Sequence, residues 1–401
     1  MSDVTLTARQ RRRSLSAVIA SMTVQALIFG LSMPLLALAL EARGIDKLTI
    51  GLSAGAQAVA VLTIAPFAAR LISALGLPRL MIGSTLLSVV VFLLLPVFPD
   101  IYAWFILRFL LGLFGSIVWI AGEAWINQIA EDRSRGRVIA LYSAALAAGN
   151  GIGPFVLAQT GTAGWLPFLV SGGLIAVSAV PLLLAADASP TMSGQPSVKF
   201  HRLLWMAPTA MFLNGVFAAT YMALITFLPI YSQHFGLGEA SSLYLLSIMA
   251  FGGLAFQLPM GWLADRYNRR LLVIISVLFL IACTAALPFI IVVSIWNDVF
   301  IFIFGGVFSS LYTLALILLG ERFKGPNLAA ASALFTAIWG MGSIIGPPLG
   351  GIGMDLWQPQ GLILVVVLMF VLYLPFPIRG YLRQRRLGGD GGAETVLSDR
   401  L

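Results

Sequence analysis

The chain has 401 residues, of which 59% are hydrophobic and only 10% are charged. Soluble globular proteins are about half apolar and about a quarter charged, so this composition excludes a soluble enzyme, a secreted disulfide scaffold and a disordered protein. The formal net charge of +8 would suit a nucleic-acid partner, but the placement of the basic residues favours membrane orientation as its cause.

Apolar runs follow one another along the whole chain, and each is long enough to cross a bilayer, which takes about 20 residues. In chain order they are 15–40, 49–72, 79–98, 101–128, 138–160, 165–185, 203–233, 241–263, 271–290, 298–319, 328–350 and 361–381. Backbone polar groups in lipid must be satisfied within the segment, so runs of this length are helices and not the shorter strands of a barrel. The sequence therefore predicts an all-α integral membrane protein with twelve transmembrane helices. The first run is too long for a cleavable signal peptide.

The basic residues gather at one membrane face. If the N-terminus is cytoplasmic, 21 of the 24 Lys and Arg residues fall on the cytoplasmic side. Only Arg43 and Lys47 fall outside, and Arg108 lies within a span. Cytoplasmic loops carry the excess of basic residues in membrane proteins, so we expect both termini in the cytoplasm. The basic stretches 9–13 and 379–386 also suit contact with anionic membrane lipid.

One break between spans is longer than the others. It reads ADASPTMSGQPSVKFHR at 186–202, and it is rich in Ser, Pro and Gly. It predicts a cytoplasmic linker between an N-terminal six-helix bundle, 1–185, and a C-terminal six-helix bundle, 203–401, which ends in a basic tail.

A repeated pattern supports two related halves. Gly-x-x-x-Gly-Pro occurs in the fifth and in the eleventh span, 193 positions apart. Its residues are Gly149, Gly153 and Pro154, then Gly342, Gly346 and Pro347. We expect them to allow close helix packing and bending. Duplicated halves place a substrate site between them near the bilayer midplane.

Two further motifs lie in the fourth span and in the loop after the eighth. The fourth span contains RFLLGLFG at 108–115, and the loop reads GWLADRYNRR at 261–270. With the twelve spans, the linker and the Gly-Pro pattern, these motifs resemble the major facilitator superfamily of secondary transporters. The loop departs from the family signature only at Asn268, where the family has glycine. The fifth span lacks the trailing glycine pair of drug/proton antiporters, having Leu157 and Ala158 instead.

The resemblance implies a cytoplasmic gate at this loop, formed by Gly261, Asp265, Arg266, Arg269 and Arg270. In the family the aspartate faces the N-terminus of a neighbouring helix, and the arginines pair with acids across the gate. A carboxylate at a helix N-terminus gains about 0.3–2 kcal/mol. The alternative is a solvated turn that only sets orientation.

The fourth span carries candidate substrate or coupling residues on one face. Gly112, Gly115, Trp119 and Glu123 lie within about 60° of Arg108 on a helical wheel. A charge within a span is costly unless it is paired or faces a wet cavity, so Arg108 and Glu123 are candidate functional residues. The alternative for Arg108 is a structural arginine bonded to backbone carbonyls or glutamine side chains, and for Glu123 an ion pair with the arginines at 133–137.

Polar side chains on three other spans complete the candidate site. The resemblance places the first, fourth, seventh and tenth helices around the cavity. The candidates on them are Gln25, Asn214, Tyr221 and Tyr312, and ordinary helix–helix hydrogen bonding is the alternative for each.

These observations predict a secondary transporter of a small organic molecule that works by alternating access, in the inner membrane of a bacterium. We expect proton-coupled efflux by a monomer, without enzyme activity, metal or cofactor, and with no nucleic-acid partner. His201 and His234 fall on opposite membrane sides, and no phosphate-binding loop follows the glycines at 149–153. One alternative is an importer or uniporter of a small organic anion bound by Arg108. Another is a receptor or lipid-moving protein on the same fold.

Overall fold

The computed structural model describes residues 7–130, 135–186, 204–291, 294–323 and 326–389, and these ranges are helical apart from short connections. The first six helices are α1 (Ala8–Glu41), α2 (Lys47–Leu75), α3 (Leu77–Leu94), α4 (Ile101–Ile129), α5 (Arg135–Thr160) and α6 (Leu166–Leu184). The later ones are α8 (Pro208–Gln233), α9 (Glu239–Arg266), α10 (Arg269–Ile290), α11 (Ser294–Arg322), α12 (Pro326–Leu356), α13 (Gly361–Tyr373) and α14 (Pro375–Gly389). The predicted linker falls almost entirely outside the described residues.

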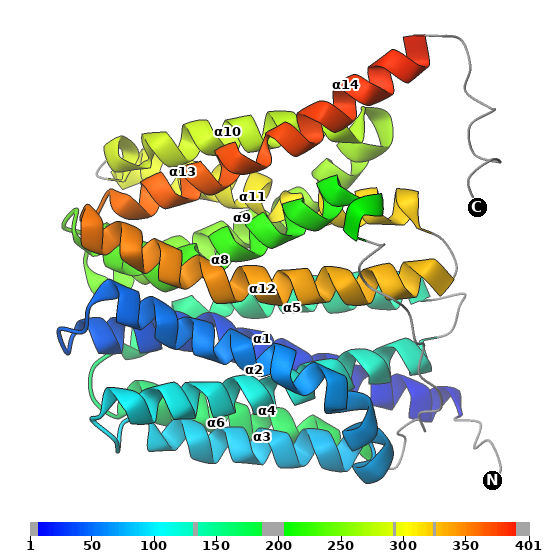
Figure 1. The fold of residues 1–401 in the computed structure, drawn as a ribbon. Coiled ribbons are helices and arrows are strands. Elements are labelled where there is room, and N and C mark those ends of the chain that lie inside the picture. Colours follow the sequence, from blue (N-terminus) through cyan, green and yellow to red (C-terminus); the bar gives the residue numbers. More distant parts are fainter. Residues whose placement is uncertain (1–6, 131–134, 187–203, 292–293, 324–325, 390–401) are drawn as a thin grey trace.

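The helices confirm the predicted all-α membrane fold. Eleven segments in the described ranges are long and apolar enough to cross a membrane, and one of them, Gly361–Gln384, runs through both α13 and α14. The twelfth is α12, which has 31 residues and lies alongside the others (Figure 1). The last predicted span, 361–381, falls within this segment, whose two helices meet at Leu374. Pro375 lacks the backbone N–H that would continue α13.

Short polar side chains begin several helices. Asp46 accepts a hydrogen bond from the Thr49 backbone N–H at the start of α2, over 2.8 Å. Asp100 does the same for α4, where it accepts from the Ala103 N–H over 3.1 Å. Such caps satisfy backbone donors that the first turn of a helix leaves without a partner. The turns between spans therefore stop and restart helices at fixed positions.

The helices form two groups that pack in the same way (Figure 1). In the first group α1 packs against α5 and α2 against α4, and in the second group α8 packs against α12 and α9 against α11. The two sets of neighbours correspond when α1, α2, α4 and α5 are matched with α8, α9, α11 and α12, in that order. We refer to these groups as the first and the second half.

The Gly-x-x-x-Gly-Pro segments lie at equivalent crossings of the two halves. Gly153 of α5 faces the Leu27 carbonyl of α1 so closely that a side-chain carbon would clash with it. Gly346 of α12 faces the Ala219 carbonyl of α8 in the same manner. Gly149 and Gly342, one turn earlier, are equally tight. The absence of a side chain lets these backbones approach.

The halves meet through α2 against α12 and α5 against α9. Four hydrogen bonds between the halves lie at one end of the bundle, where α2 and α9 begin and α5 and α12 end. There Glu239 accepts from the Thr162 N–H over 2.8 Å, and Gln159 donates to the Tyr244 hydroxyl. We call this the joined end. The opposite end, where α1 and α8 begin, is the linker end.

Candidate functional site

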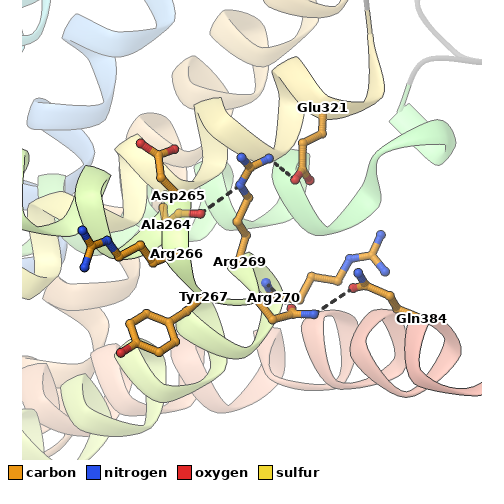
Figure 2. A pocket seen from close by; sticks show the side chains of 9 residues that line it. Ala264, Asp265, Arg266, Tyr267, Arg269, Arg270, Glu321 and Gln384 are labelled. Atoms are coloured by element: carbon orange, nitrogen blue, oxygen red, sulfur yellow. Dashed lines mark hydrogen bonds and ion pairs between the residues drawn. The ribbon is translucent and has the colours of Figure 1, made fainter. Parts of the chain in front are cut away.

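The loop signature lies at the linker end and is held within the second half (Figure 2). Asn268, which replaces the family's glycine, caps α10 by accepting from the Arg270 and Leu271 N–H groups over 3.1 and 3.2 Å. Arg269 forms an ion pair with Glu321 of α11. Arg270 donates to the Gly380 carbonyl of α14 over 2.6 Å. The loop therefore ties α10 to α11 and α14.

In this structure the partners of these arginines lie within their own half, and pairing across the gate stays a prediction. The acid that pairs with Arg269 belongs to the same half, and the Arg266 guanidinium lies 4.0 Å from the ring centre of Trp262 on its own helix. Asp265 is exposed and lies apart from the Arg269–Glu321 pair (Figure 2). No side chain or backbone group in the described ranges hydrogen-bonds to it. A pocket of about 300 Å³ is lined by these residues and by Gln384 of α14, which accepts a hydrogen bond from the Asn268 side chain over 3.3 Å.

Arg108 is completely buried between helices of the first half. Its guanidinium donates to the Ser53 hydroxyl over 3.3 Å and contacts the Met33 sulfur over 3.5 Å. Its Nε has no hydrogen-bond partner among the described residues, and no described carboxylate pairs with it. The structural arginine expected as an alternative would bond backbone carbonyls or glutamine side chains, and these partners are different.

Glu123, on the same helix, has the opposite environment. Its side chain is exposed, and the Trp119 indole N–H donates to its carboxylate over 3.0 Å. Glu123 also lies within electrostatic range of the Tyr142 hydroxyl on α5 and the Tyr312 hydroxyl on α11. Because Tyr312 belongs to the second half, Glu123 lies near the boundary between the halves. It lies 15 residues, about 22 Å, along the helix from Arg108.

Aromatic side chains of the second half form a cluster behind Tyr312. The Phe217 ring lies 5.7 Å from Tyr312, 5.8 Å from Tyr221 and 5.1 Å from Phe308 between ring centres. Phe335 of α12 adjoins Tyr312 at 5.8 Å. Tyr312 is 37% exposed, whereas Phe217 and Phe308 are buried. Tyr312 is thus the exposed member of the cluster, and it is the one within electrostatic range of Glu123.

The remaining predicted polar residues serve helix contacts. Asn214 is buried and donates to the Phe335 carbonyl over 2.6 Å, and its side-chain oxygen has no partner in the described ranges. Gln25 donates to the Ser178 hydroxyl over 3.2 Å, so it joins α1 to α6 within the first half. His234 contacts Gln358 over 2.9 Å, and His201 lies outside the described residues.

Four residues at these contacts were not among the predicted site residues. They are Tyr142 beside Glu123, Glu321 beside Arg269, and Glu239 and Asp355 at the joined end. Only the acids carried a signal in the sequence, as charges at the ends of apolar runs. In the described part of the chain, no group of three His, Cys, Asp or Glu residues is arranged to hold a metal ion.

A sequence model of the Major Facilitator Superfamily matches residues 18–314 and, in a second match, 210–389. The chain belongs to this superfamily. The uncharacterized MFS-type transporter YfkF of Bacillus subtilis (strain 168) is 25% identical over 353 residues, which cover 84% of this chain and 88% of that protein. The uncharacterized MFS-type transporter YcaD of Salmonella enteritidis PT4 is 22% identical over 289 residues, covering 71% and 74%. The chain is thus a membrane transporter and not an enzyme.

Solved structures share the fold at low sequence identity. A bacterial homologue of the human lysosomal transporter Spinster, in an inward-facing and unoccupied conformation, superposes with a TM-score of 0.74 at 14% identity, covering 95% of this chain and 98% of that one. The nucleoside transporter NupG gives a TM-score of 0.72 at 12% identity, covering 94% and 99%. These likenesses concern the fold.

Proposed function

We propose that this secondary transporter exchanges protons for a small organic molecule at a central site between the two halves. On the first half the site consists of Glu123, Trp119 and Tyr142. On the second half it consists of Tyr312 with the aromatic cluster behind it. The observation that carries the proposal is the exposed carboxylate of Glu123, which lies within electrostatic range of Tyr312 of the other half.

Proton coupling is the use of Glu123 that its surroundings favour. An ionisable residue inside a membrane protein is costly, and it is retained where it serves a substrate or proton pathway. Glu123 has an indole donor and two nearby hydroxyl groups but no cation beside it among the described residues. The predicted ion pair with the arginines at 133–137 falls partly outside the described residues, since 131–134 are not described. One carboxylate that binds either a proton or the substrate couples their movements.

The chemistry of the site favours a cationic or neutral aromatic molecule as substrate. A carboxylate attracts cations, and aromatic faces bind both flat rings and cationic groups. The alternative of an organic anion bound by Arg108 has less support, because Arg108 is sealed from solvent in this conformation. Of these two ionisable residues, only Glu123 is accessible, and its charge is negative.

The proposed orientation in the membrane rests on the charge distribution. The basic residues favour a cytoplasmic linker end, so the hydrogen-bonded joined end faces the outside. The conformation described here is then the one that opens toward the cytoplasm. We propose efflux across a bacterial inner membrane by a monomer, with Asp265 acting at the gate in the opposite conformation.

The test is proton-driven flux in proteoliposomes, with Glu123→Gln against Asp298→Asn as a matched loss of one acid. Asp298 is exposed on α11, on the first turns at the joined end. Substrates are first selected by thermal shift of the purified protein with aromatic cations, neutral aromatics and aromatic carboxylates. We expect Glu123→Gln to lose transport driven by a pH gradient, and Asp298→Asn to retain it.

Three other outcomes would contradict this proposal. Flux through Glu123→Gln with the pH dependence of the original protein would remove this residue from coupling. Ligand binding without flux in any gradient would favour the receptor alternative. Binding of aromatic carboxylates alone would favour the anion alternative.

A further inference from the structure

At the joined end, a carboxylate of the second half binds the first turn of a helix in the first half. Asp355, near the end of α12, accepts from the Lys47 backbone N–H over 3.1 Å and from the Leu48 backbone N–H over 2.8 Å. These two groups are the first two N–H groups of α2. The contact joins residues that lie 308 and 307 positions apart in the chain.

The first turn of α2 depends on both halves for its hydrogen bonds. The first N–H groups of a helix have no partner within the helix. Here the Thr49 N–H donates to the Asp46 side chain and the Ile50 N–H to the Asp46 carbonyl, both within the first half. The two N–H groups that remain donate to Asp355. One carboxylate from the second half thus completes the start of α2, where the helix dipole also favours a negative charge.

The backbones of α2 and α12 pack closely on either side of this contact. Gly351, one turn before Asp355, faces the Lys47 carbonyl so closely that a side-chain carbon would clash with it. Gly51, one turn after Lys47, faces the Pro347 carbonyl in the same way. The Lys47 ammonium does not serve Asp355, because it pairs with Glu41 of its own half. The carboxylate therefore binds backbone donors and not the lysine side chain.

We propose that Asp355 is the latch of the joined end, and that its two hydrogen bonds to α2 break whenever the halves separate there. This inference rests on the proposed alternating access. The latch is reversible because Asp355 is exposed at the end of α12 and α2 begins beside it, so water replaces the lost partners on both sides. Asp355 positions the halves and has no contact with the central site.

The test measures the distance between the halves in the full-length protein in lipid nanodiscs. Spin labels are placed at Ala42→Cys in the first half and Ser241→Cys in the second, in a Cys283→Ala background. Both labelled positions are exposed and lie at the joined end. Asp355→Asn keeps the size of the side chain but loses the charge and places an amide N–H₂ against a backbone donor. We expect the ratio of long to short distances to rise at least about tenfold, as for loss of hydrogen bonds to a charged group.

The donor side provides a second variant that leaves Asp355 intact. Lys47→Pro removes one of the two N–H groups at the first helical position, which proline accepts. Asp46, at φ −63° and ψ 155°, already has the backbone that precedes a proline. Lys47→Ala is the matched control, since it loses the same ammonium group but keeps the N–H. We expect Lys47→Pro to lengthen the distances relative to Lys47→Ala, and to add nothing to Asp355→Ala.

A third variant separates loss of the contact between the halves from mere loss of a negative charge near α2. Asp46→Asn also removes a carboxylate at the start of α2, but asparagine caps a helix as well as aspartate does. It should leave the distances unchanged. Distances in Asp355→Asn and Lys47→Pro equal to those of their controls would overturn the latch. This readout needs no substrate or proton, so a failure of the Glu123 test leaves it standing, and the reverse also holds.

Discussion

Two ionisable side chains of α4 show how position along one helix decides chemistry. Arg108 is fully buried, whereas Glu123, about 22 Å further along, is exposed and lies within electrostatic range of Tyr312 of the second half. The helical wheel places them on one face, but a wheel carries no information about depth along the axis. The two residues therefore belong to separate environments, and a single substrate cannot be expected to bridge them in this conformation.

Arg108→Met tests whether the buried arginine is structural. Its guanidinium has only a hydroxyl and a thioether as partners, and replacing a poorly paired buried charge by an apolar chain of similar length costs little stability. We expect the melting temperature of Arg108→Met to stay within about 4 °C of the original, a change of about 1 kcal/mol. Flux should fall if Arg108 acts in another conformation. A large loss of melting temperature together with poor insertion would instead assign it to the fold.

At the scale of elements, α12 serves both halves at once. Gly342 and Gly346 pack against α8 of its own half, whereas Pro347, Gly351 and the Asp355 carboxylate meet α2 of the other half. Contacts with the two neighbours alternate along the helix, since Gly340 also meets Leu62 of α2 and Gly350 meets Phe227 of α8. Pro347 and Pro348 interrupt the hydrogen-bond ladder within this stretch.

Gly346→Ala tests the packing of α12 on α8. A methyl group there meets the Ala219 carbonyl, and backbone cannot move aside as a flexible side chain can. Overpacking of this kind costs about 1–3 kcal/mol or more, so we expect a lower melting temperature and less monodisperse protein. Gly83→Ala in α3 is the control, because nothing lies within 4 Å of its added carbon. Alanine is the better helix former, so Gly83→Ala should be neutral or stabilising. Equal behaviour of the two variants would contradict the tight crossing.

For the whole molecule, hydrophobic run length predicted the fold because lipid leaves a chain few options. The predicted spans correspond to the observed helices, apart from the break at Pro375. The contacts that join the halves were not predictable in this way. Asp355 and Lys47 are about 300 positions apart, and both appear in the sequence as ordinary charges beside a turn. Likewise, the Arg269–Glu321 pair depends on how α10 lies against α11. The local hydrophobic pattern determines where each helix forms. Which charged residues at the helix ends come into contact depends on how the helices are placed relative to one another.

The orientation of the whole molecule remains a prediction from charge, and α2 offers a matched pair of positions to test it. Ala42, just before this helix, and Ala74, near its other end, are both exposed alanines at opposite ends of the bundle. Each is changed to cysteine in a Cys283→Ala background, which removes the only native cysteine. Because basic residues favour the cytoplasm, a membrane-impermeant maleimide should label Ala42→Cys in intact cells. Ala74→Cys should react only after the membrane is permeabilised. The reverse pattern would place the joined end in the cytoplasm. The conformation described here would then open outward, and the proposed latch would close the cytoplasmic side.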